Sequence, residues 1–152
     1  MIVRIIKGIW FFSLLVTVAV LLYSYASFPE EIQIRDGAAS QTISRNGLFY
    51  AVLGLMAVFN TLVFVVTRIM GEEDPFFRTW FYGLVVFFNL FILISLQFFS
   101  LYNSQEKFDY GSIGYIIYGC VSLIILWASL WPLNLILQYF RPKRAITQDS
   151  NG

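Results

Sequence analysis

Two amide side chains, Asn60 and Asn89, are the groups best placed to do chemistry inside the apolar parts of this chain. An amide donates and accepts hydrogen bonds but does not titrate, so it binds polar groups and does not act as a general acid or base. Each amide lies near the middle of an uncharged apolar run, and neighbouring runs would bring both to a similar depth. The pair is therefore either a hydrogen bond between helices, worth on the order of 1 kcal/mol, or a polar ligand or permeation site.

The usual catalytic and metal-binding groups are missing from the sequence. It has no histidine and one cysteine, Cys120, which excludes imidazole ligation of haem, histidine-containing zinc sites and cysteine clusters. A hydroxyl such as that of Ser95 has no imidazole or carboxylate within the apolar runs to activate it. All nine acidic residues lie outside these runs, whereas coupled transport uses ionisable groups at membrane depth. We therefore expect no enzyme activity, no cofactor and no coupled pump.

Four uncharged apolar runs must position these residues. The 152-residue chain is 59% hydrophobic and 19% aromatic, more than a soluble domain of this size could bury. Each run is long enough to cross about 30 Å of hydrocarbon as a helix of about 20 residues. We predict an all-α integral membrane protein in which residues 1–140 form a single domain, an antiparallel four-transmembrane-helix bundle. The predicted helices span about residues 8–26, 48–68, 79–101 and 113–137, and the tail, 141–152, is expected to be disordered.

Basic residues predict the orientation of the bundle. Seven of the ten Lys and Arg residues lie before the first run, between the second and third runs, or in the tail, and three lie in the other two connections. Short basic segments tend to stay in the cytoplasm, so both termini are predicted to be cytoplasmic. Trp10, Trp80 and Trp131 would then lie near the inner membrane interface.

The formal net charge of +1 gives no reason to expect nucleic acid as a partner. The one basic cluster, Arg141, Lys143 and Arg144, would hold the last helix in place and contact anionic lipid. A specific protein partner for this cluster is the alternative.

The first apolar run has a second interpretation. Arg4 and Lys7 precede it, and Ser24-Tyr25-Ala26 resembles the cleavage site of a secretory signal peptide. The long apolar stretch and the bulky Tyr25 and Phe28 favour an uncleaved helix.

The first connection has a pattern of its own. Polar and apolar residues alternate in 31–35 and again in 41–45, and Asp36-Gly37 between them is a turn pair. This pattern predicts a small β-hairpin. Its Ile32, Ile34 and Ile43 need cover, either from the helix ends or from another protein. In the second connection, Asp74-Pro75 predicts the start of a helix.

Small residues recur at intervals that allow helices to approach closely. They are Ala51, Gly54 and Ala57 in the second run and Gly114, Gly119 and Ser122 in the fourth. We expect them to pack helices within the chain, with the seam of a homo-oligomer as the alternative.

The first connection also resembles a segment of SdpI-type bacterial membrane proteins. The resemblance covers about residues 22–64 and consists of Phe28-Pro29-Glu30-Glu31-Ile32-Gln33-Ile34-Arg35, Gly37 and Ser44-Arg45 before the helix that contains Asn60. The family pattern is Leu-Pro, then Ile-Pro-x-His, a Gly and a Ser-Lys pair, so Gln33 replaces the second proline and Arg35 the histidine. The family includes immunity and signalling proteins that protect cells from a secreted toxin. The resemblance implies a bacterial inner-membrane origin.

These observations favour a non-enzymatic protein of the bacterial inner membrane that acts through protein contacts, as an accessory subunit or an immunity-like factor. The expected partners are the lipid bilayer and either another membrane protein or a second copy of the chain. The alternative is a small channel or transporter lined by neutral polar residues, in which Asn60 and Asn89 face water.

Overall fold

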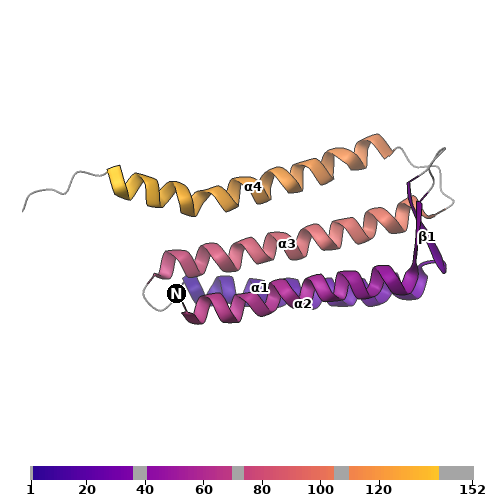
Figure 1. The fold of residues 1–152 in the computed structure, drawn as a ribbon, viewed down its shortest axis with the longest axis horizontal. Helices are drawn as coiled ribbons and strands as arrows, with labels where there is room; N and C mark the ends of the chain where they lie inside the picture. The colour runs from indigo at the N-terminus through magenta and orange to yellow at the C-terminus, as the bar shows by residue number, and fades with distance from the viewer. Residues whose placement is uncertain (1, 36–40, 70–73, 105–109, 141–152) are drawn as a thin grey trace, which may run out of the picture.

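Four long helices and a two-stranded sheet make up the protein in the computed structural model, which describes residues 2–35, 41–69, 74–104 and 110–140. The elements are α1 (Ile2–Ser27), β1 (Glu31–Arg35), β2 (Gln41–Ser44), α2 (Arg45–Ile69), α3 (Pro75–Tyr102) and α4 (Tyr110–Phe140) (Figure 1). Each helix is long and apolar enough to cross a membrane. The sequence therefore located the four helices correctly.

All four helices extend beyond the predicted spans. The first begins at Ile2 rather than near residue 8, and the fourth continues to Phe140 rather than residue 137. The predicted spans follow the uncharged residues, whereas Arg4 and Lys7 lie within α1. A helix continues as long as its backbone hydrogen bonds continue, and long basic side chains near its ends reach toward water. Hydrophobicity therefore underestimated the helix lengths.

The third helix begins where the sequence predicted. Asp74 is its N-cap residue, and its Oδ1 accepts hydrogen bonds from the backbone N–H groups of Phe76 at 2.9 Å and Phe77 at 3.1 Å. Pro75 takes the first helical position, where its missing N–H group has no partner to lose. These contacts confirm the helix-start prediction.

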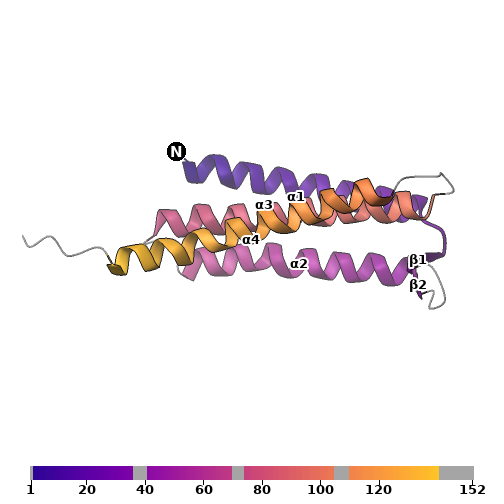
Figure 2. The same ribbon diagram turned by 90° about the horizontal axis from the view of Figure 1, so that it is seen from above.

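Helix α3 lies in the middle of the molecule and contacts each of the other three helices. The two ribbon views together place α1 and α2 on one side of α3 and α4 on the opposite side (Figures 1 and 2). Two apolar clusters fill the space between α1, α2 and α3. The first consists of Leu21, Phe28, Ile32, Met56, Ile92 and Leu96, and the second of Trp10, Val63, Tyr82, Val85 and Val86.

Helix α4 adds no buried residue along Gly114–Phe140. It is joined to α3 by two reciprocal hydrogen bonds, in which Nε1 of Trp80 donates to the carbonyl of Trp127 at 2.8 Å and Nε1 of Trp127 donates to the carbonyl of Trp80 at 2.9 Å. A Cβ atom at Gly83 would lie 2.5 Å from Cζ2 of Trp127. Glycine at position 83 therefore lets the indole of α4 rest directly on the backbone of α3.

The two strands of the predicted β-hairpin are present, and the predicted turn at Asp36-Gly37 lies outside the described residues. Strands β1 and β2 pair antiparallel, with Ile32 opposite Ile43. Ile32 is fully buried against the helix ends, and Ile43 packs beside it. Ile34 is 44% exposed, so the helix ends do not cover it, and cover by another protein stays a prediction. The register shifts between Gln33 and Arg35, and such an irregularity breaks the strict alternation that would place Ile32 and Ile34 on one face.

Candidate functional site

The two amides singled out by the sequence meet in the interior between α2 and α3. Nδ2 of Asn60 donates to Oδ1 of Asn89 at 3.2 Å, and Nδ2 of Asn89 lies 3.4 Å from Oδ1 of Asn60. Asn60 is 7% exposed and Asn89 is fully buried. The hydrogen bond that the sequence made feasible is therefore present, between two buried side chains.

Helix α1 supplies three further members of this polar cluster. Nε1 of Trp10 donates to Oδ1 of Asn60 at 2.8 Å, and Nδ2 of Asn89 donates to Oγ of Ser13 at 3.1 Å. The hydroxyl of Thr17 lies 2.8 Å from the carbonyl oxygen of Ser13 and 3.2 Å from that of Asn89. We call Trp10, Ser13, Thr17, Asn60 and Asn89 the polar network.

Sequence reasoning missed the contribution of α1. Trp10 is 3% exposed, so its indole lies inside the helix bundle, and its predicted depth near the inner interface stays a prediction. Its indole packs edge-on against Tyr82, with 5.5 Å between the ring centroids. The signal was present: residues 10, 13 and 17 are spaced by three and four positions, which places them on one face of a helix.

Every amide hydrogen of the polar network has an acceptor. Nδ2 of Asn60 donates to the carbonyl of Met56 at 2.8 Å as well as to Asn89. Over the residues that the structure describes, the buried side-chain atoms without a partner are Nε of Arg45 and Nε of Arg78, both outside the network. A fully satisfied buried network is rigid and specifies one arrangement of its helices.

The chemistry available to the network is hydrogen bonding alone, because none of its members ionises near neutral pH. The described ranges also contain no group of three His, Cys, Asp or Glu residues that could hold a metal ion.

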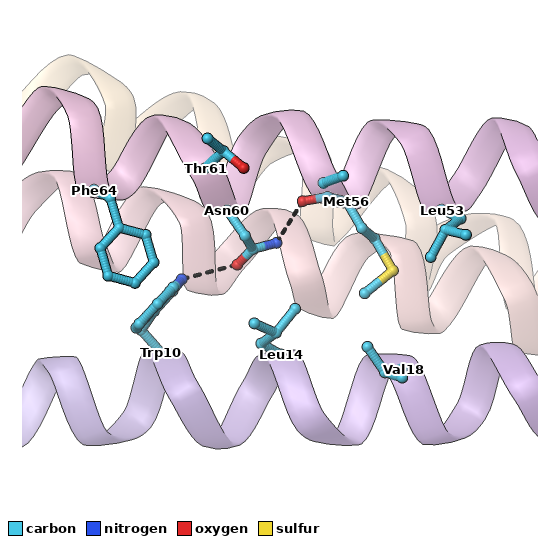
Figure 3. A pocket seen from close by; sticks show the side chains of 9 residues that line it. Trp10, Leu14, Val18, Leu53, Met56, Asn60, Thr61 and Phe64 are labelled. Atoms are coloured by element: carbon cyan, nitrogen blue, oxygen red, sulfur yellow. Dashed lines mark hydrogen bonds between the residues drawn. The ribbon is translucent and has the colours of Figure 1, made fainter.

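An apolar groove runs beside the network, between α1 and α2 (Figure 3). Its volume is about 240 Å³, and its lining residues are Trp10, Leu14, Val18, Leu53, Met56, Ala57, Asn60, Thr61 and Phe64. Figure 3 shows the amide of Asn60 directed at Trp10 and at the backbone of Met56. The polar groups of Trp10 and Asn60 at the groove are thus already paired, and most of the groove's lining side chains are apolar.

The predicted small-residue positions do not pack helices together within the chain. Ala51, Gly54, Ala57, Gly119 and Ser122 are exposed and Gly114 is partly exposed. A Cβ atom added at Gly54, Gly114 or Gly119 would meet nothing within 4 Å. The close approach of two helices occurs at Gly83 instead, where α3 meets the indole of Trp127 on α4. No repeated spacing of small residues marks this site in the sequence. The basic cluster of Arg141, Lys143 and Arg144 lies outside the described residues.

Comparison with protein-family models, curated proteins and solved structures gave no match to this chain. The resemblance to SdpI-type proteins therefore remains an expectation from the first connection.

Proposed function

We propose that this chain is a non-enzymatic protein of the bacterial inner membrane that acts through protein contacts, as an accessory subunit or an immunity-like factor. The observation that carries the proposal is the closed polar network. Its two amides use their hydrogens on Met56, Ser13 and each other. A permeation path needs polar groups that are free to replace the hydration of a solute, and these amides are committed to protein partners.

In this proposal the four helices cross the bilayer as an antiparallel bundle with both termini in the cytoplasm. The large exposed side chains of α4, among them Ile125, Leu126, Leu133 and Leu137, support contact with lipid. An exposed apolar surface of this extent is unfavourable in water. The distribution of basic residues supports the orientation.

The polar network also supports an uncleaved first helix. Removal of α1 as a signal peptide would delete Trp10, Ser13 and Thr17, and it would take one hydrogen-bond partner from Asn60 and two from Asn89. A buried amide without partners is unfavourable by about 1–3 kcal/mol. The mature protein therefore retains α1 in this proposal.

The surface for protein contacts consists of the outward faces of the helices. The apolar groove between α1 and α2 and the exposed small residues of α2 and α4 lie on these faces. Small residues allow a partner helix to approach closely, so another membrane protein or a second copy of the chain is the expected partner. The SdpI-type resemblance suggests the immunity-like role.

The alternative is a small channel or transporter, and one experiment separates the two. The protein is purified in mild detergent, copurifying proteins are identified, and the same preparation is reconstituted into liposomes for flux measurements with ions and small solutes. We expect a copurifying membrane protein and no flux. Flux that disappears in the double variant Asn60→Leu with Asn89→Leu, while the protein stays folded, would overturn the contact-based function.

A further inference from the structure

Arg45, the first residue of α2, is held in a fixed position at the hairpin end of the molecule. Its Nη1 donates to the carbonyl of Phe28 at 3.2 Å, and its guanidinium carbon lies 5.1 Å from the centroid of the Tyr25 ring. The hydroxyl of Tyr25 donates to Oδ1 of Asn46 at 2.9 Å. Tyr25 thus orients two neighbouring polar side chains at once, one through its ring and one through its hydroxyl.

The guanidinium of Arg45 is nevertheless short of partners. It carries five N–H donors, and one side-chain hydrogen bond, to Phe28, joins it to the described residues. Its Nε has no hydrogen-bond partner but is buried and out of reach of a ligand, so the spare donors are the remaining N–H groups of its two Nη atoms. Within the described part of the chain no carboxylate forms a salt bridge with it, although Glu30 and Glu31 are close in the fold. An arginine in such a position has spare donors for an anion.

Glu30 and Glu31 line the same pocket as Arg45. The pocket has a volume of about 400 Å³, and its other lining residues are Ser44 and Asn46. The backbone N–H of Arg45 donates to the carbonyl of Glu30 at 2.9 Å, which fixes the two chain segments relative to each other. The anchoring of Arg45 on Phe28 and Tyr25 keeps its guanidinium from pairing with either carboxylate. The pocket therefore presents positive and negative charge at separate positions.

We propose that this pocket binds the phosphoethanolamine headgroup of a membrane phospholipid, with the phosphate on Arg45 and the ammonium group on Glu30 and Glu31. A simple anion would meet two repelling carboxylates, and a simple cation would meet the repelling guanidinium. A zwitterion pairs with both at once. The side-chain amide of Asn46 is positioned to donate a further hydrogen bond to the phosphate.

The position of the pocket favours a lipid over a soluble zwitterion, and here the inference rests on the proposed membrane insertion. Arg45 begins α2, and apolar residues follow it within one turn. Tyr50 and Leu53 on α2 and Leu22 on α1 are exposed large side chains just beyond the pocket. In a bilayer this boundary between charged and apolar surface lies at headgroup depth, where a tyrosine such as Tyr25 is favourable. The acyl chains of the bound lipid can then cover the adjacent apolar faces.

Native mass spectrometry of the full chain, with phosphatidylethanolamine and phosphatidylglycerol supplied in equal amounts, tests the proposal. The unmodified protein is expected to retain one phosphatidylethanolamine at least about tenfold more strongly than phosphatidylglycerol, since charge-assisted hydrogen bonds have this effect on affinity. The double variant Glu30→Gln with Glu31→Gln should retain both lipids equally. Arg45→Gln should lose about tenfold in retention of either lipid. Arg68→Gln, which removes the same charge from the other end of α2, is the matched control and should behave as the unmodified protein.

Two results would overturn the proposal: equal retention of the two lipids by the unmodified protein, or an unchanged preference in the Glu30/Glu31 double variant. The double variant alters two exposed side chains, so it is expected to fold. It therefore tests the proposal even where Arg45→Gln does not fold. Competition separates the phosphoethanolamine group from zwitterions in general: glycerophosphoethanolamine should displace the lipid, and equal displacement by glycine at the same concentration would overturn the headgroup assignment. Extraction of the unmodified protein from membranes by alkaline carbonate would contradict membrane insertion itself, whatever the lipid preference in detergent.

Discussion

The side-chain amide of Asn103 pairs with the main chain of Gln33 as a neighbouring strand would. The backbone N–H of Gln33 donates to Oδ1 of Asn103 at 2.8 Å, and Nδ2 of Asn103 donates to the carbonyl of Gln33 at 3.2 Å. Asn103 is also the C-cap residue of α3, and its Nδ2 donates to the carbonyl of Phe99 at 2.9 Å. One side chain thus ends a helix and joins the hairpin to it.

Replacement of Asn103 by alanine should loosen the hairpin. The variant loses both hydrogen bonds to Gln33, and each is worth about 0.5–1.5 kcal/mol. Hydrogen exchange at the Gln33 amide should accelerate by about tenfold or more, since 1.4 kcal/mol corresponds to a factor of ten. Asn103→Asp is the control, because it keeps the acceptor for the Gln33 N–H and should protect that amide. Equal exchange in the alanine variant and the unmodified protein would contradict the role of Asn103.

Replacement of both amides of the polar network should destabilise the protein by less than the sum of the two single replacements. Asn60→Leu leaves the indole of Trp10 without a partner and leaves the side chain of Asn89 with Ser13 alone, at a cost of about 1–3 kcal/mol. Once Asn60 is gone, Asn89→Leu removes a group that is already poorly paired. The free energy of unfolding of the double variant should therefore lie above the value expected from additivity, by about 0.5–3 kcal/mol. Strict additivity in a double-mutant cycle, measured in detergent or bicelles, would show that the two amides are not coupled.

Gly83→Ala should displace α4 from α3. The new Cβ would lie 2.5 Å from the indole of Trp127, and overpacking of this kind is unfavourable by about 1–3 kcal/mol. Tryptophan fluorescence and thermal stability in detergent should both change. Gly54→Ala and Gly119→Ala are matched controls, since each added methyl group meets nothing within 4 Å. In these variants the higher helix propensity of alanine should leave stability unchanged or raise it by up to about 1 kcal/mol. A Gly83→Ala variant as stable as these controls would contradict the close packing.

The two ends of α2 should lie on opposite sides of the membrane. Thr42 precedes the helix and Ile69 ends it, and both are exposed. Single cysteines at these positions, in a Cys120→Ser background, report the side by labelling in intact spheroplasts with an impermeant reagent. Thr42→Cys should be labelled and Ile69→Cys should be protected until the membrane is opened. The reverse labelling pattern would show that the orientation is opposite to the predicted one. Equal labelling of both cysteines would exclude a membrane-spanning α2.

The sequence predicted those features that depend on local composition. The absence of charge marked the four helices, alternation around Ile32 and Ile43 marked the hairpin, and Asp74 marked the start of α3. In the polar network, similar depth in neighbouring helices predicted the Asn60–Asn89 pair, and helical spacing places Trp10, Ser13 and Thr17 on one face of α1. Neither pattern shows that this face of α1 packs against Asn60. The position of α4 was equally inaccessible, because a helix that is apolar on all sides has no face to indicate its neighbour. The role of Gly83 was missed because a single glycine that contacts a single indole leaves no repeated spacing in the sequence.

The polar network also sets an order of events in biosynthesis. Its partners lie on three helices, and Asn89 is 76 positions after Ser13, with which it shares a hydrogen bond. In the proposed topology the helices enter the bilayer in chain order, so Trp10 can pair with Asn60 before α3 is present, whereas the bond from Asn60 to Asn89 forms only with α3. The hydroxyls of Ser13 and Thr17 meanwhile donate to carbonyls of their own helix. Buried polar groups without partners are unfavourable in hydrocarbon, so the first two helices remain a loosely joined pair until α3 arrives between them. In the proposed topology the interval before α3 is inserted is therefore the time at which wrong helix partners compete best for Asn60.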